Sequence, residues 1–126
     1  MIITKIEELR IWQQAREFVR AVSAILKRPS FRTDPKLRDQ LGDSSVSVLS
    51  NISEGFGQAT DRSFANYVSI ARSSNNEAMS QLAVACWRGH ITEDELAEFE
   101  RRSAALGKGM TVLIHYLRNT DRKQRG

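Results

Sequence analysis

Cysteine, proline and long apolar runs are scarce in this sequence of 126 residues. Cys86 is the single cysteine, which excludes an intrachain disulfide and suits a reducing compartment, and we interpret it as a small buried apolar residue. No apolar stretch is long enough to cross a bilayer, and the N-terminal residues lack the apolar core of a signal peptide. We therefore expect a cytoplasmic protein with no membrane partner.

Side chains at the spacing of a metal or catalytic site are also scarce. A di-metal helical bundle needs inward-facing Glu and Glu-x-x-His spacings, and neither His90 nor His115 has one. Gly55 and Gly57 follow a predicted helix instead of preceding one, which argues against a phosphate-binding loop. The serines of residues 35–56 have no histidine near them in the sequence to act as a base. We interpret both histidines as surface residues and predict a non-enzymatic protein without cofactor or metal.

Apolar residues recur at steps of three and four along the chain, which predicts helices and no strands. We expect helices at about 6–27, 35–56, 61–88 and 92–118, followed by a frayed tail at 119–126. Sequential helices joined by short loops lie antiparallel to their neighbours. Residues 1–126 are therefore predicted to form one all-α domain, an antiparallel up-down-up-down four-helix bundle.

The first predicted helix carries two parallel apolar lines. A stripe of this width packs against two neighbouring helices of the same chain, or part of it faces another subunit. The first line is Trp12, Ala15, Val19, Val22 and Leu26, and the second is Ile11, Phe18 and Ile25.

Helix starts and stops are marked by specific residues. Pro29 ends the first helix, and Asp34 is the expected N-cap of the second. Asp61 is the expected N-cap of the third helix, and Thr92 with Glu95 forms a capping box at the start of the fourth.

The stretch at residues 50–57 carries the most information in the chain. We expect it to be the closing turn of the second helix, with Gly55 and Gly57 available for a left-handed conformation. Glu54 would meet the negative end of the helix dipole there, so we predict a compensating partner, such as Arg16, Arg20 or a backbone N–H group of the following turn.

Polar residues within the apolar seams predict a structural layer. Asn51 and Asn75 are expected to share this layer between the second and third helices. Glu54 and Glu77 can be imagined as an acid/base pair, but we interpret them as structural. The residues assigned to the layer and the helix end are Ser50, Asn51, Glu54, Gly55, Phe56, Gly57, Asn75 and Glu77.

Two stretches carry a resemblance to a known family. Residues 6–16 resemble the family's opening, in which a Leu, a Trp and an Ala-Arg pair recur, and residues 50–57 resemble its signature Ser-Asn-Ile-Ala-Glu-Gly-Phe-Gly, with Ser53 in place of alanine. The chain thus resembles the four-helix-bundle family encoded in intervening sequences of bacterial large-subunit ribosomal RNA genes. It is also similar to the accessory variability determinant proteins of diversity-generating retroelements. Matching third-helix residues are Phe64, Ile70, Ala71, Ser74, Glu77, Gln81 and Leu82.

The resemblance implies a ring-shaped homopentamer and, in the retroelement relatives, a basic surface that engages nucleic acid and a reverse transcriptase. For most members of the family the function is unknown. Gly42 and Asp43 stand where the family usually has two arginines, which weakens the implication of nucleic-acid binding. Leu49 replaces the usual proline, which predicts a straighter second helix.

The net charge of +4 is concentrated toward the two ends of the chain. Such a surplus attracts nucleic acid through phosphate contacts, although it is equally the ordinary solvated surface of a helical protein. The candidate contacts are Arg16, Arg20, Lys27, Arg28, Arg32, Arg118, Arg122, Lys123 and Arg125.

Three functions follow from these observations. The first is a non-enzymatic oligomeric scaffold that binds RNA or DNA through basic surface residues, with a protein partner alongside. The alternative is a protein-interaction ring with no nucleic-acid role, and the third is an enzyme of unknown type. Salt separates the first two, because phosphate-driven binding falls steeply with ionic strength.

Overall fold

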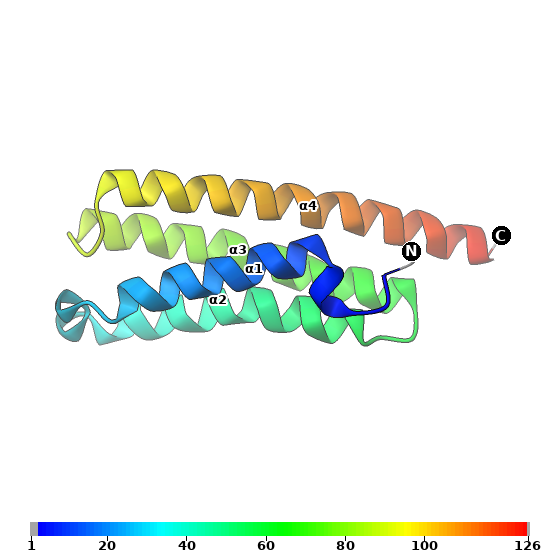
Figure 1. Cartoon of the computed structure of the whole chain (residues 1–126), viewed down its shortest axis with the longest axis horizontal. Coiled ribbons are helices and arrows are strands. Elements are labelled where there is room, and N and C mark those ends of the chain that lie inside the picture. Colours follow the sequence, from blue (N-terminus) through cyan, green and yellow to red (C-terminus); the bar gives the residue numbers. More distant parts are fainter. Residues whose placement is uncertain (1–2, 126) are drawn as a thin grey trace.

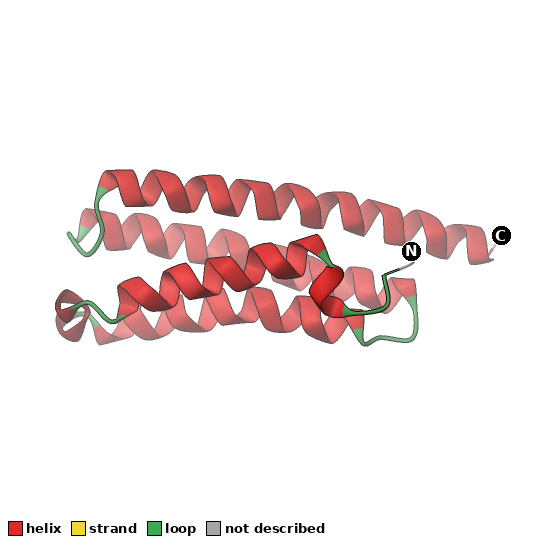
Figure 2. Ribbon diagram, viewed as in Figure 1, coloured by secondary structure: helices red, strands yellow, loops and turns green. Residues whose placement is uncertain are grey.

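The computed structural model describes residues 3–125, with the side chains of residues 3–120. This part of the chain is all-α and contains no strand. Neighbouring helices run antiparallel, so the chain goes up, down, up and down (Figures 1 and 2). The helices are α1 (Arg10–Leu26), α2 (Pro35–Phe56), α3 (Asp61–Trp87) and α4 (Glu93–Arg125), with short 3-10 helices η1 (Ile6–Glu8) and η2 (Pro29–Thr33).

Two helix ends differ from the predicted ranges. The first helix is interrupted at Leu9, whose φ of −76° and ψ of 117° are extended, so that η1 and α1 are separate elements. The fourth helix continues to Arg125 instead of ending near residue 118. No glycine or proline lies between residues 118 and 125, so nothing in the sequence interrupts its backbone hydrogen bonding.

The second apolar line of α1 lies entirely in the core, because Ile11, Phe18 and Ile25 are all buried. In the first line Ala15 and Val22 are buried as well, whereas Trp12, Val19 and Leu26 are only partly buried. Phe18 meets Phe99 of α4 edge to face, with ring centroids 6.1 Å apart. The second line therefore packs within the chain and is not available to another subunit.

The remaining core residues come from all of the other helices. Among the largest fully buried side chains are Leu41, Val48 and Ile52 of α2, Val68 and Leu82 of α3, and Leu106, Met110, Ile114 and Leu117 of α4.

Helix caps agree with the sequence in some places and differ in others. The capping box of α4 is confirmed: Thr92 N–H donates to Glu95 Oε1 at 2.9 Å, and Glu95 N–H donates to Thr92 Oγ1 at 3.1 Å. The N-cap of α3 is Thr60 and not Asp61, because Thr60 Oγ1 accepts from Ser63 N–H at 3.1 Å. Asp34 does occupy the N-cap position of α2, but its side chain makes no capping hydrogen bond.

The glycines of the 50–57 stretch do not adopt the expected left-handed conformation. Gly55 is a buried residue within α2, and Gly57 has a φ of −80°. A Cβ at Gly55 would lie 2.9 Å from Tyr67 Cβ of α3, so this glycine is required for close helix packing. The left-handed glycine among the described residues is Gly89, whose φ of 81° ends α3.

The predicted partner of Glu54 is not found. Its side chain is exposed and forms no hydrogen bond or ion pair with the described residues. Arg16 and Arg20, the candidate partners, instead bond Glu17 Oε1 at 3.2 and 3.4 Å. Glu54 is tolerated because water solvates an exposed carboxylate and screens the dipole.

The predicted polar layer is divided between two interfaces. Asn75 pairs with Ser103 of α4, donating from Nδ2 to the Ser103 carbonyl at 3.0 Å and accepting from the Ser103 hydroxyl at 2.9 Å. Asn51 instead donates to the carbonyl of Ser47, whose hydroxyl lies 2.8 Å from Ser74 Oγ of α3. Asn51 and Asn75 therefore do not share a layer, because Asn75 turns toward α4.

Among the described residues, no helix has the length and sustained apolar character needed to cross a membrane.

Candidate nucleic-acid interface

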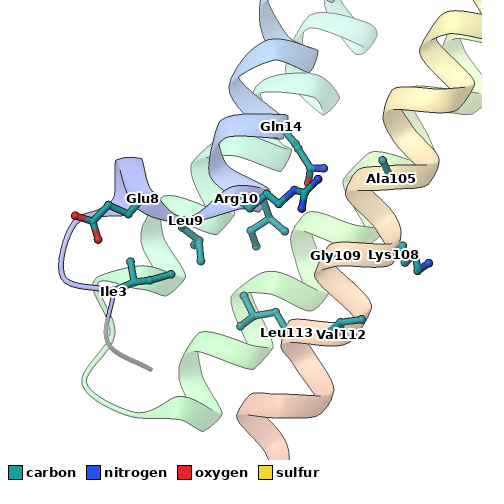
Figure 3. Close-up of a pocket in the computed structure, with 11 residues that line it drawn as sticks. Ile3, Glu8, Leu9, Arg10, Gln14, Ala105, Lys108, Gly109, Val112 and Leu113 are labelled. Atoms are coloured by element: carbon teal, nitrogen blue, oxygen red, sulfur yellow. The ribbon is translucent and has the colours of Figure 1, made fainter.

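A cleft of about 540 Å³ lies between the start of α1 and the middle of α4. Figure 3 shows Ile3 and Leu9 on one side of it and Leu113 and Val112 on the other. The N-terminal segment and the start of α1 line one side of the cleft, and α4 lines the other (Figure 3). Its lining residues are Ile3, Glu8, Leu9, Arg10, Ile11, Gln14, Ala105, Lys108, Gly109, Val112 and Leu113.

Small residues of α4 set how closely the two helices approach at this cleft. A Cβ on Gly109 would lie 2.9 Å from Ile11 Cγ2, so only glycine allows the observed contact. Ala105, one turn earlier, is also small and leaves the floor of the cleft open.

Two basic side chains stand at the rim of the cleft. Arg10 reaches from α1 toward α4, and Lys108 points outward from α4 (Figure 3). Neither makes an ion pair with a residue of the described part of the chain. Glu8 also lines the cleft, but its carboxylate points away from α4 (Figure 3). The rim is therefore positively charged.

A second hollow of about 410 Å³ continues along the same two helices. It shares Gln14 and Ala105 with the first, so the two form one surface, which we call the α1/α4 groove. The lining of this second part is Gln13, Gln14, Arg16, Glu17, Arg102 and Ala105.

The arginines of the second part are partly neutralised by neighbouring acids. Arg16 bonds Glu17 at 3.2 Å, and its guanidinium lies 5.3 Å from the Trp12 ring centroid. Arg102 bonds Glu98 at 3.4 Å. Both arginine side chains remain about 40% exposed, at 40% and 41%, so they are accessible to a ligand.

The predicted contact residues do not form one surface. Arg16 lines the groove, and Arg20, bonded to Glu17 at 3.4 Å, follows it one turn later on α1. Lys27 and Arg32 are exposed at the end of the bundle where α1 runs into η2, and the C-terminal end of α4 lies at the opposite end (Figure 1).

The candidate contacts at the C-terminal end of the chain lie on α4. Arg118 is exposed and donates to Ser69 Oγ of α3 at 3.4 Å. The side chains of Arg122, Lys123 and Arg125 lie outside the described residues.

Arg28 has a structural role that the sequence did not indicate. It forms a double hydrogen bond with the Glu95 carboxylate and also donates to the His90 carbonyl at 3.0 Å. The guanidinium of Arg28, together with the Thr92 N–H, lowers the pKa of Glu95 to about 2. The Glu95 carboxylate in turn raises the pKa of Arg28. Arg28 is therefore committed to joining the end of α1 to the start of α4.

A second polar cluster closes the same end of the bundle and corrects the interpretation of His90. This residue is buried, stacks on Phe31 at 4.2 Å, and has its Nε2 2.9 Å from Asp34 Oδ2 and its Nδ1 2.8 Å from Ser30 Oγ. Asp34 also accepts from Arg88 at 3.0 Å. The hydrogen bond with His90, followed by that with Arg88, lowers the pKa of Asp34. His115, in contrast, is exposed as predicted.

The remaining motif residues differ in their surroundings. Phe56 packs edge to face on Phe64 at 6.1 Å, and Ser50 is exposed. Glu77 is exposed and accepts a hydrogen bond from Gln81 at 3.4 Å. Among the described residues, no three His, Cys, Asp or Glu side chains are grouped so as to hold a metal ion.

Three basic residues of the groove were missed by the sequence reasoning. Arg10, Arg102 and Lys108 were not among the candidate contacts, although all three line the groove. No local motif marks them. Their proximity depends on how α1 and α4, which are distant in the sequence, align with each other.

Comparisons with known proteins agree on family and fold. Residues 7–111 match the family described as 23S rRNA-intervening sequence protein. No curated protein matches the chain significantly. A similar fold occurs in the 1.70 Å crystal structure of a protein of unknown function from the S23 ribosomal protein family of Bacteroides thetaiotaomicron. The TM-score is 0.74 at 20% identity, over 82% of this chain and 97% of the other.

Proposed function

The chain belongs to the 23S rRNA-intervening sequence protein family, and from this premise we propose that it is a non-enzymatic oligomeric scaffold that binds RNA through the α1/α4 groove. The family has no assigned activity to transfer, because the similar crystal structure is of a protein of unknown function. The proposal therefore rests on the surface of this chain.

The observation that carries the proposal is the row of four basic side chains along the groove. Arg10 and Lys108 line its first part, and Arg16 and Arg102 line its second. Glu17 and Glu98 offset part of this charge by pairing with Arg16 and Arg102, whereas Glu8 points away (Figure 3). Basic side chains from both helices that border a groove match the repeated negative charge of a nucleic-acid backbone.

The chemistry of the lining favours binding over catalysis. The described residues that line the groove include no serine, cysteine or histidine, and its titratable side chains other than arginine are Glu8, Glu17 and Lys108. Arginine and glutamine side chains instead supply hydrogen-bond donors for phosphate and base edges.

Exposed apolar side chains outside the groove support self-association. Trp87 at the end of α3 is 79% exposed, and Ile70 of α3 is 50% exposed. Aromatic and aliphatic residues in such positions are typical anchors of protein interfaces. A second copy bound there would leave the α1/α4 groove available to RNA.

A titration with salt tests the proposal. A short fluorescent single-stranded RNA is added to the purified protein at several salt concentrations, and anisotropy and light scattering are recorded. We expect an oligomer whose RNA affinity falls steeply and log-linearly with salt.

Two results would overturn the proposal. RNA binding that is absent at low salt would favour the protein-interaction ring, and a monomeric mass would remove the oligomeric part. An affinity that does not change with salt would show that phosphate contacts do not drive binding.

A further inference from the structure

The α1/α4 groove changes character along its length. Its first part is walled by the aliphatic side chains of Ile3, Leu9, Val112 and Leu113 (Figure 3). Its second part has a polar lining that includes Arg16, Glu17 and Arg102. Phosphate contacts explain the second part, but they give no reason for an apolar cleft in the first.

Val112 makes the apolar wall unusual. It is 62% exposed, whereas Leu106, Met110, Ile114 and Leu117 of the same helix are buried. An aliphatic side chain left in water gains free energy when a ligand covers it. The cleft volume of about 540 Å³ lies in the range of clefts that hold small organic molecules.

Gln14 marks the boundary between the two parts and lines both of them. Its side chain reaches toward α4, and Oε1 lies 3.6 Å from the place where a Cβ of Gly109 would stand (Figure 3). The amide makes no hydrogen bond to any described residue. It therefore has a donor and an acceptor to offer at the edge of the apolar cleft.

We propose that the apolar part of the groove holds an unpaired nucleobase of single-stranded RNA. In this arrangement, Val112 and Leu9 contact the faces of the base, Gln14 bonds its edge, and Arg10 and Lys108 contact the flanking phosphates. This inference rests on the proposed function and adds to it the class of nucleic acid that the site accepts.

Charge and shape together select this ligand over a duplex. Bases in a duplex are stacked and paired, and A-form RNA presents mainly phosphates and 2′-hydroxyls to a protein. A single strand exposes base faces, which lose contact with water in an apolar cleft. Positive rims at Arg10 and Lys108 hold the backbone on both sides of that base.

The test compares two valine variants on three probes. Val112→Ser shortens the apolar wall, and Val46→Ser is the matched control, since Val46 is a valine of similar exposure on α2, outside the groove. The probes are a short single-stranded RNA, a strand of equal length that carries no bases, and an RNA duplex of equal length. Anisotropy gives the affinities at one fixed salt concentration, and light scattering gives the mass.

We expect Val112→Ser to weaken binding of the single strand roughly three- to tenfold and to leave the base-free strand and the duplex unchanged. Val46→Ser should leave all three affinities unchanged. Equal weakening of all three probes by Val112→Ser, or no weakening of any, would overturn the inference while leaving salt-dependent RNA binding intact.

A change of mass would overturn it in another way. If Val112→Ser lowers the oligomer mass and Val46→Ser does not, then the cleft is covered by a second copy of the chain. Absence of salt-dependent binding by the unmodified protein would instead overturn the proposed function itself.

Discussion

Trp12 donates its indole N–H to the hydroxyl of Ser53 at 3.1 Å and so joins α1 to the last turns of α2. The Ser53 hydroxyl in turn donates to the Leu49 carbonyl at 2.9 Å. Alanine is usual at this place in the signature that residues 50–57 resemble, and it has no acceptor for the indole. The serine of this chain therefore adds a link between the two helices.

Replacing Ser53 with alanine should destabilise the protein. The indole N–H of Trp12 is partly buried and would lose its acceptor, at a cost of about 1 kcal/mol. Urea unfolding measures the change. Ser50→Ala is the control on the same helix, because Ser50 is exposed and bonds only the Ser47 carbonyl, at 3.4 Å. Equal stability of the two variants would show that the indole bond contributes nothing.

Two glycine-to-alanine substitutions in α2 should change the stability of the protein in opposite directions. In Gly55→Ala the new Cβ would lie 2.9 Å from Tyr67 Cβ and 3.2 Å from the Phe64 carbonyl oxygen, so α2 and α3 must separate, costing about 2 kcal/mol or more. In Gly42→Ala the nearest atom to the new Cβ is Leu26 Cδ1 at 3.5 Å, which is an ordinary contact. Because alanine favours the helix more than glycine does, this variant should be more stable than the unmodified protein by up to about 1 kcal/mol.

Thermal or urea unfolding of both glycine variants measures these changes in stability. A Gly55→Ala protein as stable as the unmodified chain would mean that the α2–α3 interface can expand without loss.

Ser103→Ala should lower the free energy of unfolding more than a substitution of an exposed serine does. Its hydroxyl is the donor to Asn75 Oδ1, and Asn75 is only 2% exposed, so the amide oxygen would remain buried and unpaired. We expect a loss of about 1–2 kcal/mol. Ser73→Ala, at an exposed position of α3, should change stability little. Adding Asn75→Ala to each protein completes a double-mutant cycle, and an interaction energy near zero would contradict the assignment.

The Arg28–Glu95 pair should make stability depend on acid pH. The pKa of Glu95 is lowered in the folded state from 4.5 to about 2, so the pair contributes fully above about pH 5 and loses its contribution as the pH falls toward 2. Glu95→Gln can still accept from Thr92 but removes the charge. This substitution should lower the free energy of unfolding by about 1 kcal/mol at neutral pH, and by progressively less as the pH falls through about 2.

Unfolding by urea at a series of pH values measures this difference. Asp34, whose pKa is also lowered, adds acid sensitivity to both proteins, so the comparison between them isolates Glu95. Glu100→Gln, at an exposed position without an ion-pair partner among the described residues, should follow the unmodified chain throughout. A constant difference between the Glu95→Gln and unmodified proteins from pH 7 to 2 would be inconsistent with the pair.

The salt dependence of RNA binding should report individual groove residues. For a single strand, each phosphate contact contributes about 0.7 to the slope of log affinity against log salt, so Arg10→Gln with Lys108→Gln should reduce the slope by about 1.4. Arg32→Gln with Lys36→Gln removes equal charge from exposed positions away from the groove. Equal slopes for the two double variants would show that binding follows net charge alone.

Much of the fold was predictable from local signals. The range of α2, residues 35–56, was predicted to the residue because Pro35 fixes its start and a glycine follows its end. The interruption at Leu9 was not predictable, since residues 6–9 contain no glycine or proline and continue the apolar pattern. No local signal in residues 6–9 therefore marks the break.

The candidate-site residues also divide into those that local sequence signals predicted and those that depend on how distant helices pack. Asn75 was correctly predicted as a polar residue within an apolar seam, but a position between two neighbouring helices can turn to either, and the prediction chose α2. Arg16 was found by charge alone, whereas Lys108 and Arg102 join it only through the alignment of α1 with α4. Ring assembly and nucleic-acid binding stay predictions for the experiments above.

The apolar wall of the α1/α4 groove also sets a calorimetric signature. Ile3, Leu9, Val112 and Leu113 keep carbon surface in contact with water, and its removal on binding lowers the heat capacity of the system. A ligand that only touches the charged rim releases ions but dehydrates little carbon. The temperature dependence of the binding enthalpy therefore shows whether a ligand enters the cleft before its chemical identity is known.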